Sequence, residues 1–241
     1  MNALFVLLIL SAYFLGALPL SYLAAKLARG IDLRRYGTGQ VGAGNLFRMT
    51  GSWKIGVTVG IFDVGKGALM LWVANMMGLS AFQQLIVGIA AIIGHNWSVF
   101  LKFSGGRGVG TALGVILVTP LLNSVTPWGL FSLLIIIAIG MLILRSSPLP
   151  ILLGVAAVPA ASWLAADPAG VTLGYLALLL TIVGKRATVP PSPDARSITK
   201  GELLLNRFLF DRDIRDRKVW MYRKPQEQEK VSSADEMRHP S

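Results

Sequence analysis

The chain has no cysteine and only two histidines among its 241 residues. Without cysteine there can be no disulfide, no thiolate metal site and no thioester intermediate. Two histidines are too few for a histidine-rich metal centre, so we expect neither a metal nor a cofactor. Charged residues are scarce as well, at 15% where soluble domains carry about 25%. These absences indicate a membrane protein whose chemistry uses no thiol and no metal.

Hydrophobic residues, by contrast, make up 54% of the chain, and the mean hydropathy is +0.61. They gather in seven apolar runs, several of them near the short end of the length that spans a bilayer. The runs lie at about 3–25, 55–76, 81–101, 109–125, 128–144, 149–166 and 169–184. The sequence therefore predicts an all-α, polytopic integral membrane protein with seven transmembrane helices.

The basic residues alternate between the connections and so predict the orientation. Lys and Arg occur at 26–54, 102–108, 145 and 185–186 and are absent at 77–80, 126–127 and 167–168. By the positive-inside rule the N-terminus is outside and the C-terminus is cytoplasmic. Because Lys26 follows the first run and no basic residue precedes it, that run is expected to be an uncleaved helix.

The end of the chain has a different composition and predicts a separate piece. We divide the chain into a membrane-embedded domain (1–186), a cytoplasmic Pro-rich break with an amphipathic segment (187–224) and a disordered tail (225–241). Residues 199–223 predict one amphipathic helix on the membrane surface. Charges alternate from Asp211 to Arg217, which favours a solvated helix face over a site.

A glycine-rich loop at 105–111, Gly-Gly-Arg-Gly-Val-Gly-Thr, separates two of the apolar runs. Glycine lets the backbone bend so that several N–H groups converge on one anion. Arg107 and the helix start that follows the loop add further attraction for a phosphate. The alternative is that these glycines only allow close packing of membrane helices.

A second cluster of glycines, hydroxyls and cations lies on the same predicted side, in the loop before the second run. It contains Ser21, Lys26, Thr38, Asn45 and Arg48 with five glycines from Gly30 to Gly44. Two loops of backbone donors and cations suit a ligand that carries more than one anionic group. The alternative is an ordinary positive-inside loop with turns at the interface.

Two titratable sites lie near these loops. Asp63 and Lys66 are three residues apart on one helix face. Ionisable groups at this depth turn inward, as a proton relay, a substrate contact or a self-neutralising pair, and we favour the pair. His95 is either a structural residue or a group that orients the ligand or carries a proton.

These residues resemble the motifs of the bacterial acyl-phosphate:glycerol-3-phosphate acyltransferases. The resemblance covers roughly 10–115, with three motifs in the family's order. They are Ser21-Tyr22-Leu23-x-x-Lys26 continuing through Gly37-Thr38-Gly39-x-x-Gly42-Ala43-x-Asn45-x-x-Arg48; Phe62-Asp63-Val64-x-Lys66-Gly67; and Gly94-His95 continuing through Val99-Phe100-Leu101-Lys102-Phe103-x-Gly105-Gly106-Arg107-Gly108-Val109-x-Thr111. The resemblance implies an enzyme that makes lysophosphatidic acid and phosphate from acyl phosphate and glycerol 3-phosphate, in phospholipid synthesis.

The same resemblance implies roles for individual residues. The catalytic residues would be Ser21, Arg48, His95 and Lys102. Thr38, Asn45, Arg48 and Arg145 would bind glycerol 3-phosphate, and Gly105, Gly106, Arg107, Gly108 and Thr111 would bind the acyl phosphate. The acyl tail would lie among the helices, where burial contributes about 0.8 kcal/mol per CH₂. No buried carboxylate is expected to serve as base, so His95 or a substrate phosphate would accept the proton.

The chain departs from the family pattern at several positions. Gln40 and Gly44 stand where Asn and Thr are expected, and Arg107 and Gly110 where Lys and Ala are usual. A serine expected three positions after Arg145 is displaced to 146–147. The third motif, expected after the last helix, is replaced by a Pro-rich stretch and the pair Asn206-Arg207.

Two other functions remain open from the sequence: a transporter of a phosphorylated metabolite and an inactive paralogue of the acyltransferase. Because the polar loops share one face and no inverted repeat is evident, we favour an enzyme at the membrane interface. We expect it in the bacterial cytoplasmic membrane, with its active site facing the cytoplasm. Its partners would be its two substrates, membrane lipid and the enzyme that makes the acyl phosphate, with no nucleic acid.

Overall fold

The computed structural model describes residues 3–192 and 195–223, and within these ranges it contains helices and loops but no strand. The α-helices are α1 (Ala3–Ala17), α2 (Leu20–Arg29), α3 (Ala43–Thr50), α4 (Trp53–Met76), α5 (Ala81–Asn96), α6 (Val109–Leu122), α7 (Trp128–Leu144), α8 (Pro148–Leu164), α9 (Ala169–Thr188), α10 (Lys200–Phe210) and α11 (Arg217–Met221). The all-α prediction is confirmed for this part of the chain, and the predicted tail at 225–241 lies outside the described residues.

Each of the seven predicted apolar runs falls on a helix, namely α1 and α4 to α9. Three stretches are long and apolar enough to cross a membrane: Ala3–Arg29, Trp53–Met76 and Ala169–Thr188. The helices α5 to α8 are apolar but shorter. At 1.5 Å per residue, a helix of about 16 residues covers about 24 Å, less than the roughly 30 Å of a hydrocarbon core. Seven complete spans therefore stay a prediction.

Large apolar side chains cover the outside of the helix bundle. Leu142 on α7 is 80% exposed and Leu164 on α8 is 85% exposed. Ile61 on α4 and Leu180 on α9 also face outward. A protein in water rarely leaves so much apolar surface uncovered, whereas lipid chains cover it at no cost. The outer surface agrees with a membrane protein.

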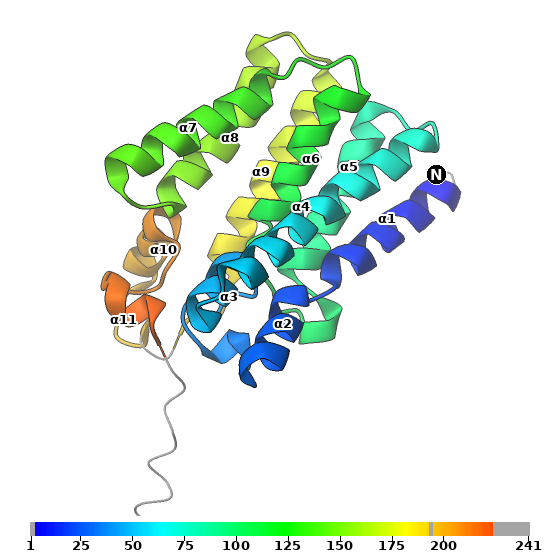
Figure 1. Cartoon of the computed structure of the whole chain (residues 1–241). Helices are drawn as coiled ribbons and strands as arrows, with labels where there is room; N and C mark the ends of the chain where they lie inside the picture. The colour runs from blue at the N-terminus through cyan, green and yellow to red at the C-terminus, as the bar shows by residue number, and fades with distance from the viewer. Residues whose placement is uncertain (1–2, 193–194, 224–241) are drawn as a thin grey trace, which may run out of the picture.

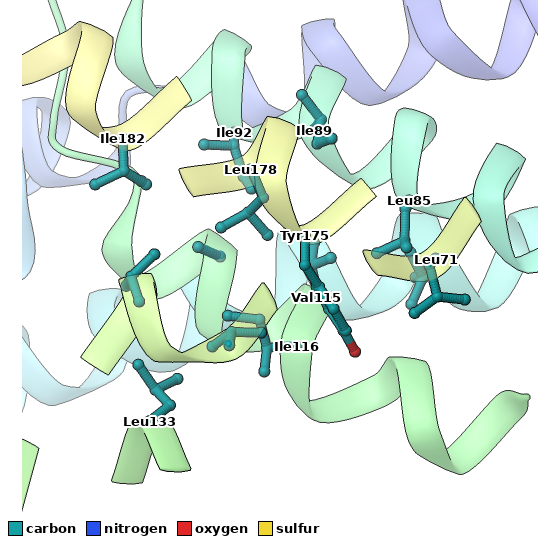
Figure 2. Packing of buried hydrophobic residues seen from close by; sticks show 14 of the residues in the cluster. Leu71, Leu85, Ile89, Ile92, Val115, Ile116, Leu133, Tyr175, Leu178 and Ile182 are labelled. Atoms are coloured by element: carbon teal, nitrogen blue, oxygen red, sulfur yellow. The ribbon is translucent and has the colours of Figure 1, made fainter. Parts of the chain in front are cut away.

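The central core lies between α4, α5, α6 and α9, with α7 and α8 closing one side. Figure 2 shows these side chains from close by, with the ring of Tyr175 among the aliphatic groups. The core residues labelled in Figure 2 are Leu71, Leu85, Ile89, Ile92, Val115, Ile116, Leu133, Tyr175, Leu178 and Ile182. This core fixes the helices whose ends carry the polar loops.

Glycines bring the two helix pairs α1–α5 and α4–α6 into backbone contact. A Cβ at Gly94 on α5 would collide with the Tyr13 carbonyl oxygen on α1, and one at Gly114 on α6 would collide with the Val64 carbonyl on α4. Small residues at helix crossings permit such close approach in membrane proteins. Since His95 follows Gly94 and Asp63 precedes Val64, this packing also places both side chains.

A break between α1 and α2 is stabilised from α4. Pro19 has no N–H and the chain leaves the helical path at Leu18, so carbonyls at the end of α1 lack their usual partners. The buried Lys66 ammonium donates to the Leu18 carbonyl at 2.7 Å and to the Gly16 carbonyl at 3.3 Å. It also lies 3.1 Å from Asp63 Oδ1, so the predicted Asp63–Lys66 pair is present.

The C-terminal part folds against one end of the bundle, together with α2 and α3 (Figure 1). The single amphipathic helix predicted over 199–223 is wrong, because α10 and α11 are separated by a non-helical stretch at 211–216. The predicted solvated charged face holds only in part, because Arg215, Asp216 and Arg217 are exposed whereas Asp213 is not. Asp213 is 3% exposed and its carboxylate accepts from Arg207 Nε at 2.7 Å. Buried partners, which the local charge alternation does not reveal, fold the first part of this stretch inward.

Candidate active site

A cavity of about 340 Å³ lies where the starts of α3, α6 and α8 meet the C-terminal part. We call it the main cavity. Its lining comes from both predicted polar loops and from segments far along the chain. The lining polar and charged residues are Thr38, Gln40, Asn45, Arg48, Asp63, His95, Arg107, Ser146, Ser147, Arg186, Asp211, Arg212 and Arg217. The structure thus joins the two loops in one site.

The main cavity is rich in positive charge. Five arginines line it, at positions 48, 107, 186, 212 and 217, against two carboxylates at 63 and 211. Burial lowers the pKa of the half-buried Arg48 guanidinium, with a further lowering from the nearby Arg217. Guanidinium groups nevertheless stay charged under all ordinary conditions, because their unperturbed pKa lies far above neutral pH. The cavity therefore suits a ligand with phosphate groups.

In the glycine-rich loop, the backbone N–H groups that face the main cavity are not those of the predicted anion-binding nest. The Gly106 N–H donates to the His95 carbonyl at 3.1 Å, and the Gly105 carbonyl accepts from Val41 N–H at 3.4 Å. These two residues therefore fix the loop. The cavity is lined instead by Gly108 and the first residues of α6. The first N–H groups of a helix have no intrahelical partner, so the start of α6 presents donors to an anion.

Gly108 makes this helix start possible. It has φ of +71°, in the left-handed region, and directly precedes α6. A Cβ here would also press on the Asn96 side chain and on Ile92. Only glycine fits both the backbone and the space without strain.

His95 and Asp63 form a buried pair at the wall of the main cavity. His95 Nδ1 lies 3.5 Å from Asp63 Oδ1, and both residues line the cavity. The other face of the ring lies against Gly106, where a Cβ would collide with Nε2. That no carboxylate serves as the base stays a prediction, but the structure places the Asp63 carboxylate beside His95. The i,i+3 spacing in the sequence indicated Lys66 as the partner of Asp63 and gave no sign of His95.

Asn45 organises the first loop from its buried position. Its Nδ2 donates to the carbonyls of Tyr36 and Gln40, each at 3.0 Å, and its Oδ1 accepts from Thr38 N–H at 3.1 Å. The side-chain amide is thus used within the loop. Substrate binding by Asn45 and Thr38, both of which line the main cavity, stays a prediction.

A second cavity of about 490 Å³ lies on the other side of Arg107. Thr38, Gln40, Arg107 and Trp220 line both cavities. Lys102 and Gly105, predicted for catalysis and for the acyl phosphate, line this second cavity and not the main one. Arg107 therefore stands between the two spaces.

Three further predicted residues, Ser21, Thr111 and Arg145, also lie away from the main cavity. Ser21 is buried and lines a space of only about 10 Å³, together with Asp63 and His95. Thr111 is buried in the first turn of α6, and its hydroxyl has no hydrogen-bond partner in the described chain. Arg145 is exposed and ends α7, outside the lining of either cavity. Their roles stay predictions.

Other lining residues were missed by the sequence reading. They are Ser146, Ser147, Arg186, Asp211, Arg212 and Arg217. For the two serines and Arg186 a signal existed, since Arg145-Ser146-Ser147 and Lys185-Arg186 stand at predicted cytoplasmic helix ends. The others lie in the stretch whose charge alternation suggested a solvated face. No cluster of three metal-ligating side chains occurs within 3–192 and 195–223.

The fold and this site define a class: a helical membrane protein with an arginine-rich cavity, suited to phosphate groups, at one end of its bundle. Comparison with known proteins narrows the class to a family. Residues 6–189 match the family model described as glycerol-3-phosphate acyltransferase. The chain belongs to this family of acyltransferases.

Individual relatives agree. Glycerol-3-phosphate acyltransferase 5 of Dehalococcoides mccartyi is 39% identical over 229 residues, which covers 92% of this chain and 95% of the relative. The enzyme of Thermus thermophilus is 43% identical over 109 residues, covering 45% of this chain and 54% of its own.

Solved structures show the same fold. The crystal structure of PlsY (YgiH), an integral membrane glycerol 3-phosphate acyltransferase, in its glycerol 3-phosphate form has a TM-score of 0.67 at 28% identity. The lysophosphatidic acid form has a TM-score of 0.64 at 30% identity, and each match covers 76% of this chain and 88% of the other. Lipid synthesis follows from membership of the family.

Proposed function

We propose that the protein transfers an acyl chain from acyl phosphate to glycerol 3-phosphate, giving lysophosphatidic acid and inorganic phosphate. The single observation that carries this is the main cavity, where five arginines and the start of α6 surround a space beside the His95–Asp63 pair. Both substrates carry a phosphate, and the related PlsY structures hold glycerol 3-phosphate and lysophosphatidic acid.

In the proposed reaction a hydroxyl oxygen of glycerol 3-phosphate attacks the acyl carbon. The new ester C–O bond forms as the C–O bond to phosphate breaks, and phosphate leaves with the bonding electrons. The hydroxyl proton passes to His95 or to a substrate phosphate. Arg48 binds the glycerol phosphate, while Arg107 and the start of α6 stabilise the departing phosphate. Acyl phosphate is already activated, so no acyl-enzyme is required.

His95 suits this role because its surroundings fix the ring. Asp63 on one side orients Nδ1, and the glycine-rich loop holds the other side. The acyl tail is proposed to leave the site between the apolar helices, where each buried CH₂ contributes about 0.8 kcal/mol. Seven spans, an outside N-terminus and a site facing the cytoplasm of a bacterial cytoplasmic membrane belong to this proposal.

The donor is tested by offering purified protein two activated forms of the same chain. With palmitoyl phosphate and glycerol 3-phosphate we expect lysophosphatidic acid, detected by mass spectrometry. With palmitoyl-CoA we expect poor turnover, since the cavity suits a compact phosphate. Efficient use of palmitoyl-CoA with no use of palmitoyl phosphate would overturn the proposal. Turnover of neither donor would favour an inactive paralogue.

A further inference from the structure

The C-terminal segment, defined here as residues 195–223, lies beyond the stretch that matches the family model, which ends at residue 189. It nevertheless lines the main cavity through Phe210, Asp211, Arg212, Arg217, Trp220 and Met221. Buried contacts hold it there. Arg186 on α9 donates to the Phe208 carbonyl at 2.9 Å, and Arg207 donates to the Ala187 carbonyl at 3.1 Å. The segment is therefore a fixed wall of the site.

Within this wall the Asp211 carboxylate joins the two loops of the site. Asp211 Oδ1 lies 2.8 Å from Arg107 Nε in the glycine-rich loop. Asp211 Oδ2 accepts from Gln40 Nε2 in the first loop at 3.0 Å. The side chains of Arg107 and Asp211 are only 10% and 14% exposed. The Arg107 contact is an ion pair and not a hydrogen bond, because the N–H direction does not meet hydrogen-bond geometry.

Both partners of Asp211 are positions where this chain departs from the resembled motifs. Gln40 stands in place of Asn, and Arg107 in place of Lys. Gln has one more methylene than Asn and so reaches further. Arg107 contacts Asp211 through Nε while its Nη1 donates to the Lys185 carbonyl at 3.4 Å. A lysine carries a single ammonium and could not offer this fork. The residues at both departures, Gln40 and Arg107, therefore contact the same carboxylate, that of Asp211.

Asp211 also offsets local charge. Arg107 lies in a cavity wall with Arg186 and Arg212, and like charges at short range repel one another. Asp211 is the carboxylate in contact with Arg107, and its removal would leave the guanidinium without that partner. The side chain would then be free to turn away, toward the second cavity, which it also lines.

We propose that Asp211 is a positioning residue that holds Arg107 for the acyl-phosphate group, so that the C-terminal segment is part of the active site. This proposal rests on the proposed function, and Asp211 lies outside the region that matches the family model. Asp211 acts through Arg107 and touches no substrate itself. Its loss should therefore weaken use of one substrate and leave use of the other nearly unchanged.

The test compares Asp211→Asn with Glu202→Gln, a matched loss of one carboxylate from the same segment. Glu202 is partly exposed and faces Arg215, away from the main cavity. We expect Asp211→Asn to raise the KM for palmitoyl phosphate roughly tenfold, in line with the coupling of contacting charged residues. The KM for glycerol 3-phosphate and the Tm should change little, and Glu202→Gln should leave all three near wild type.

A double-mutant cycle with Arg107→Lys separates positioning from general support of the fold. If Asp211 acts through Arg107, Asp211→Asn should cost less than about threefold in KM once position 107 is lysine. An equal cost in both backgrounds would overturn the proposal. So would a lower KM in Asp211→Asn, which would show that the carboxylate competes with the anion. If Asp211→Asn does not fold, Asp211→Glu, which keeps the charge and moves it, takes its place in the cycle.

A binding readout distinguishes failure of this inference from failure of the proposed function. If wild-type protein turns over no acyl phosphate, the proposed function fails on that result alone. The positioning role of Asp211 is then tested by measuring how much inorganic phosphate raises the Tm of each variant. A smaller rise in Asp211→Asn than in Glu202→Gln supports positioning, and equal rises contradict it.

Discussion

His95 Nδ1 lies 3.5 Å from Asp63 Oδ1, and the same carboxylate oxygen accepts from the Lys66 ammonium at 3.1 Å. The buried Asp63 carboxylate therefore has two kinds of partner. It contacts His95 in the site, and it contacts Lys66, which holds the end of α1 against α4. The two roles make different predictions, because one concerns catalysis and the other stability.

On the catalytic side, Asp63→Asn should lower kcat while the protein still binds both substrates. The amide cannot stabilise a protonated His95, so general base catalysis weakens by roughly 100-fold. Steady-state release of phosphate from palmitoyl phosphate measures this. An unchanged kcat in folded Asp63→Asn would remove His95 and Asp63 from the reaction and leave a substrate phosphate as the base.

On the structural side, Lys66→Met should destabilise the protein. It removes the Lys66 donor from the buried Gly16 carbonyl, at a cost of roughly 1–3 kcal/mol for an unsatisfied group. It also leaves the Leu18 carbonyl with only the Leu20 N–H as donor. Lys54→Met at the exposed start of α4 is the matched control. Thermal unfolding in detergent compares the two, and equal Tm values would contradict the role given to Lys66.

Arg48 and Arg145 were both predicted to bind glycerol 3-phosphate, and the structure separates them. Arg48 lines the main cavity, whereas Arg145 is exposed and lines neither cavity. Arg48→Ala should raise the KM for glycerol 3-phosphate by a factor equivalent to about 1.5–3 kcal/mol. Arg145→Ala should change it by less than about threefold. The reverse order would show that glycerol 3-phosphate lies elsewhere.

Gly106→Leu should abolish turnover more fully than a substitution that only fills an anion site. A Cβ at this position collides with the His95 ring and with the Val41 carbonyl, so both the loop and the base move. We expect kcat to fall at least about 100-fold, because small misplacements of reacting groups have effects of that order. Gly65→Leu, at an exposed position of α4 with open space, should leave kinetics near wild type.

The Asp32–Arg34 pair in the first loop predicts a dependence of stability on pH. The hydrogen bond from Arg34 holds the pKa of the Asp32 carboxyl below its ordinary value. A lowered folded-state pKa adds stability above the unfolded pKa of about 3.9, and this is lost as the pH falls through the folded value. The pair is partly exposed, so the effect is below about 1 kcal/mol. Tm should differ between wild type and Asp32→Asn at pH 6, and the two values should converge as the pH falls through the lowered pKa of the folded state.

The sequence indicated the polar loops because their signals are local. Glycines next to cations, together with apolar runs of membrane length, placed the loop at 105–111 and the one around Arg48 at the same end of the bundle. His95 was already a candidate beside the loop, and the family resemblance favoured a catalytic role for it over a structural one. These inferences need only short spacings and the preference of lipid for apolar side chains.

The sequence could not indicate contacts that join distant segments. Asp211 meets Arg107 and Gln40 only because α10 docks on α8 and α9, and no local spacing encodes that docking. The alternating charges from Asp211 to Arg217 look the same whether they face water or a cavity. For the same reason the Asp63–Lys66 spacing gave the pair but not its contact with His95.

The account's central claim is that one site joins the two phosphate-bearing substrates in a direct acyl transfer. The measurement that tests it most directly is the release of inorganic phosphate from palmitoyl phosphate as glycerol 3-phosphate is varied, with lysophosphatidic acid counted in the same reaction. We predict that phosphate release requires glycerol 3-phosphate and equals the lysophosphatidic acid formed, one for one. The account would be contradicted if phosphate release did not depend on glycerol 3-phosphate. It would also be contradicted if glycerol 3-phosphate were taken up into vesicles with no ester formed.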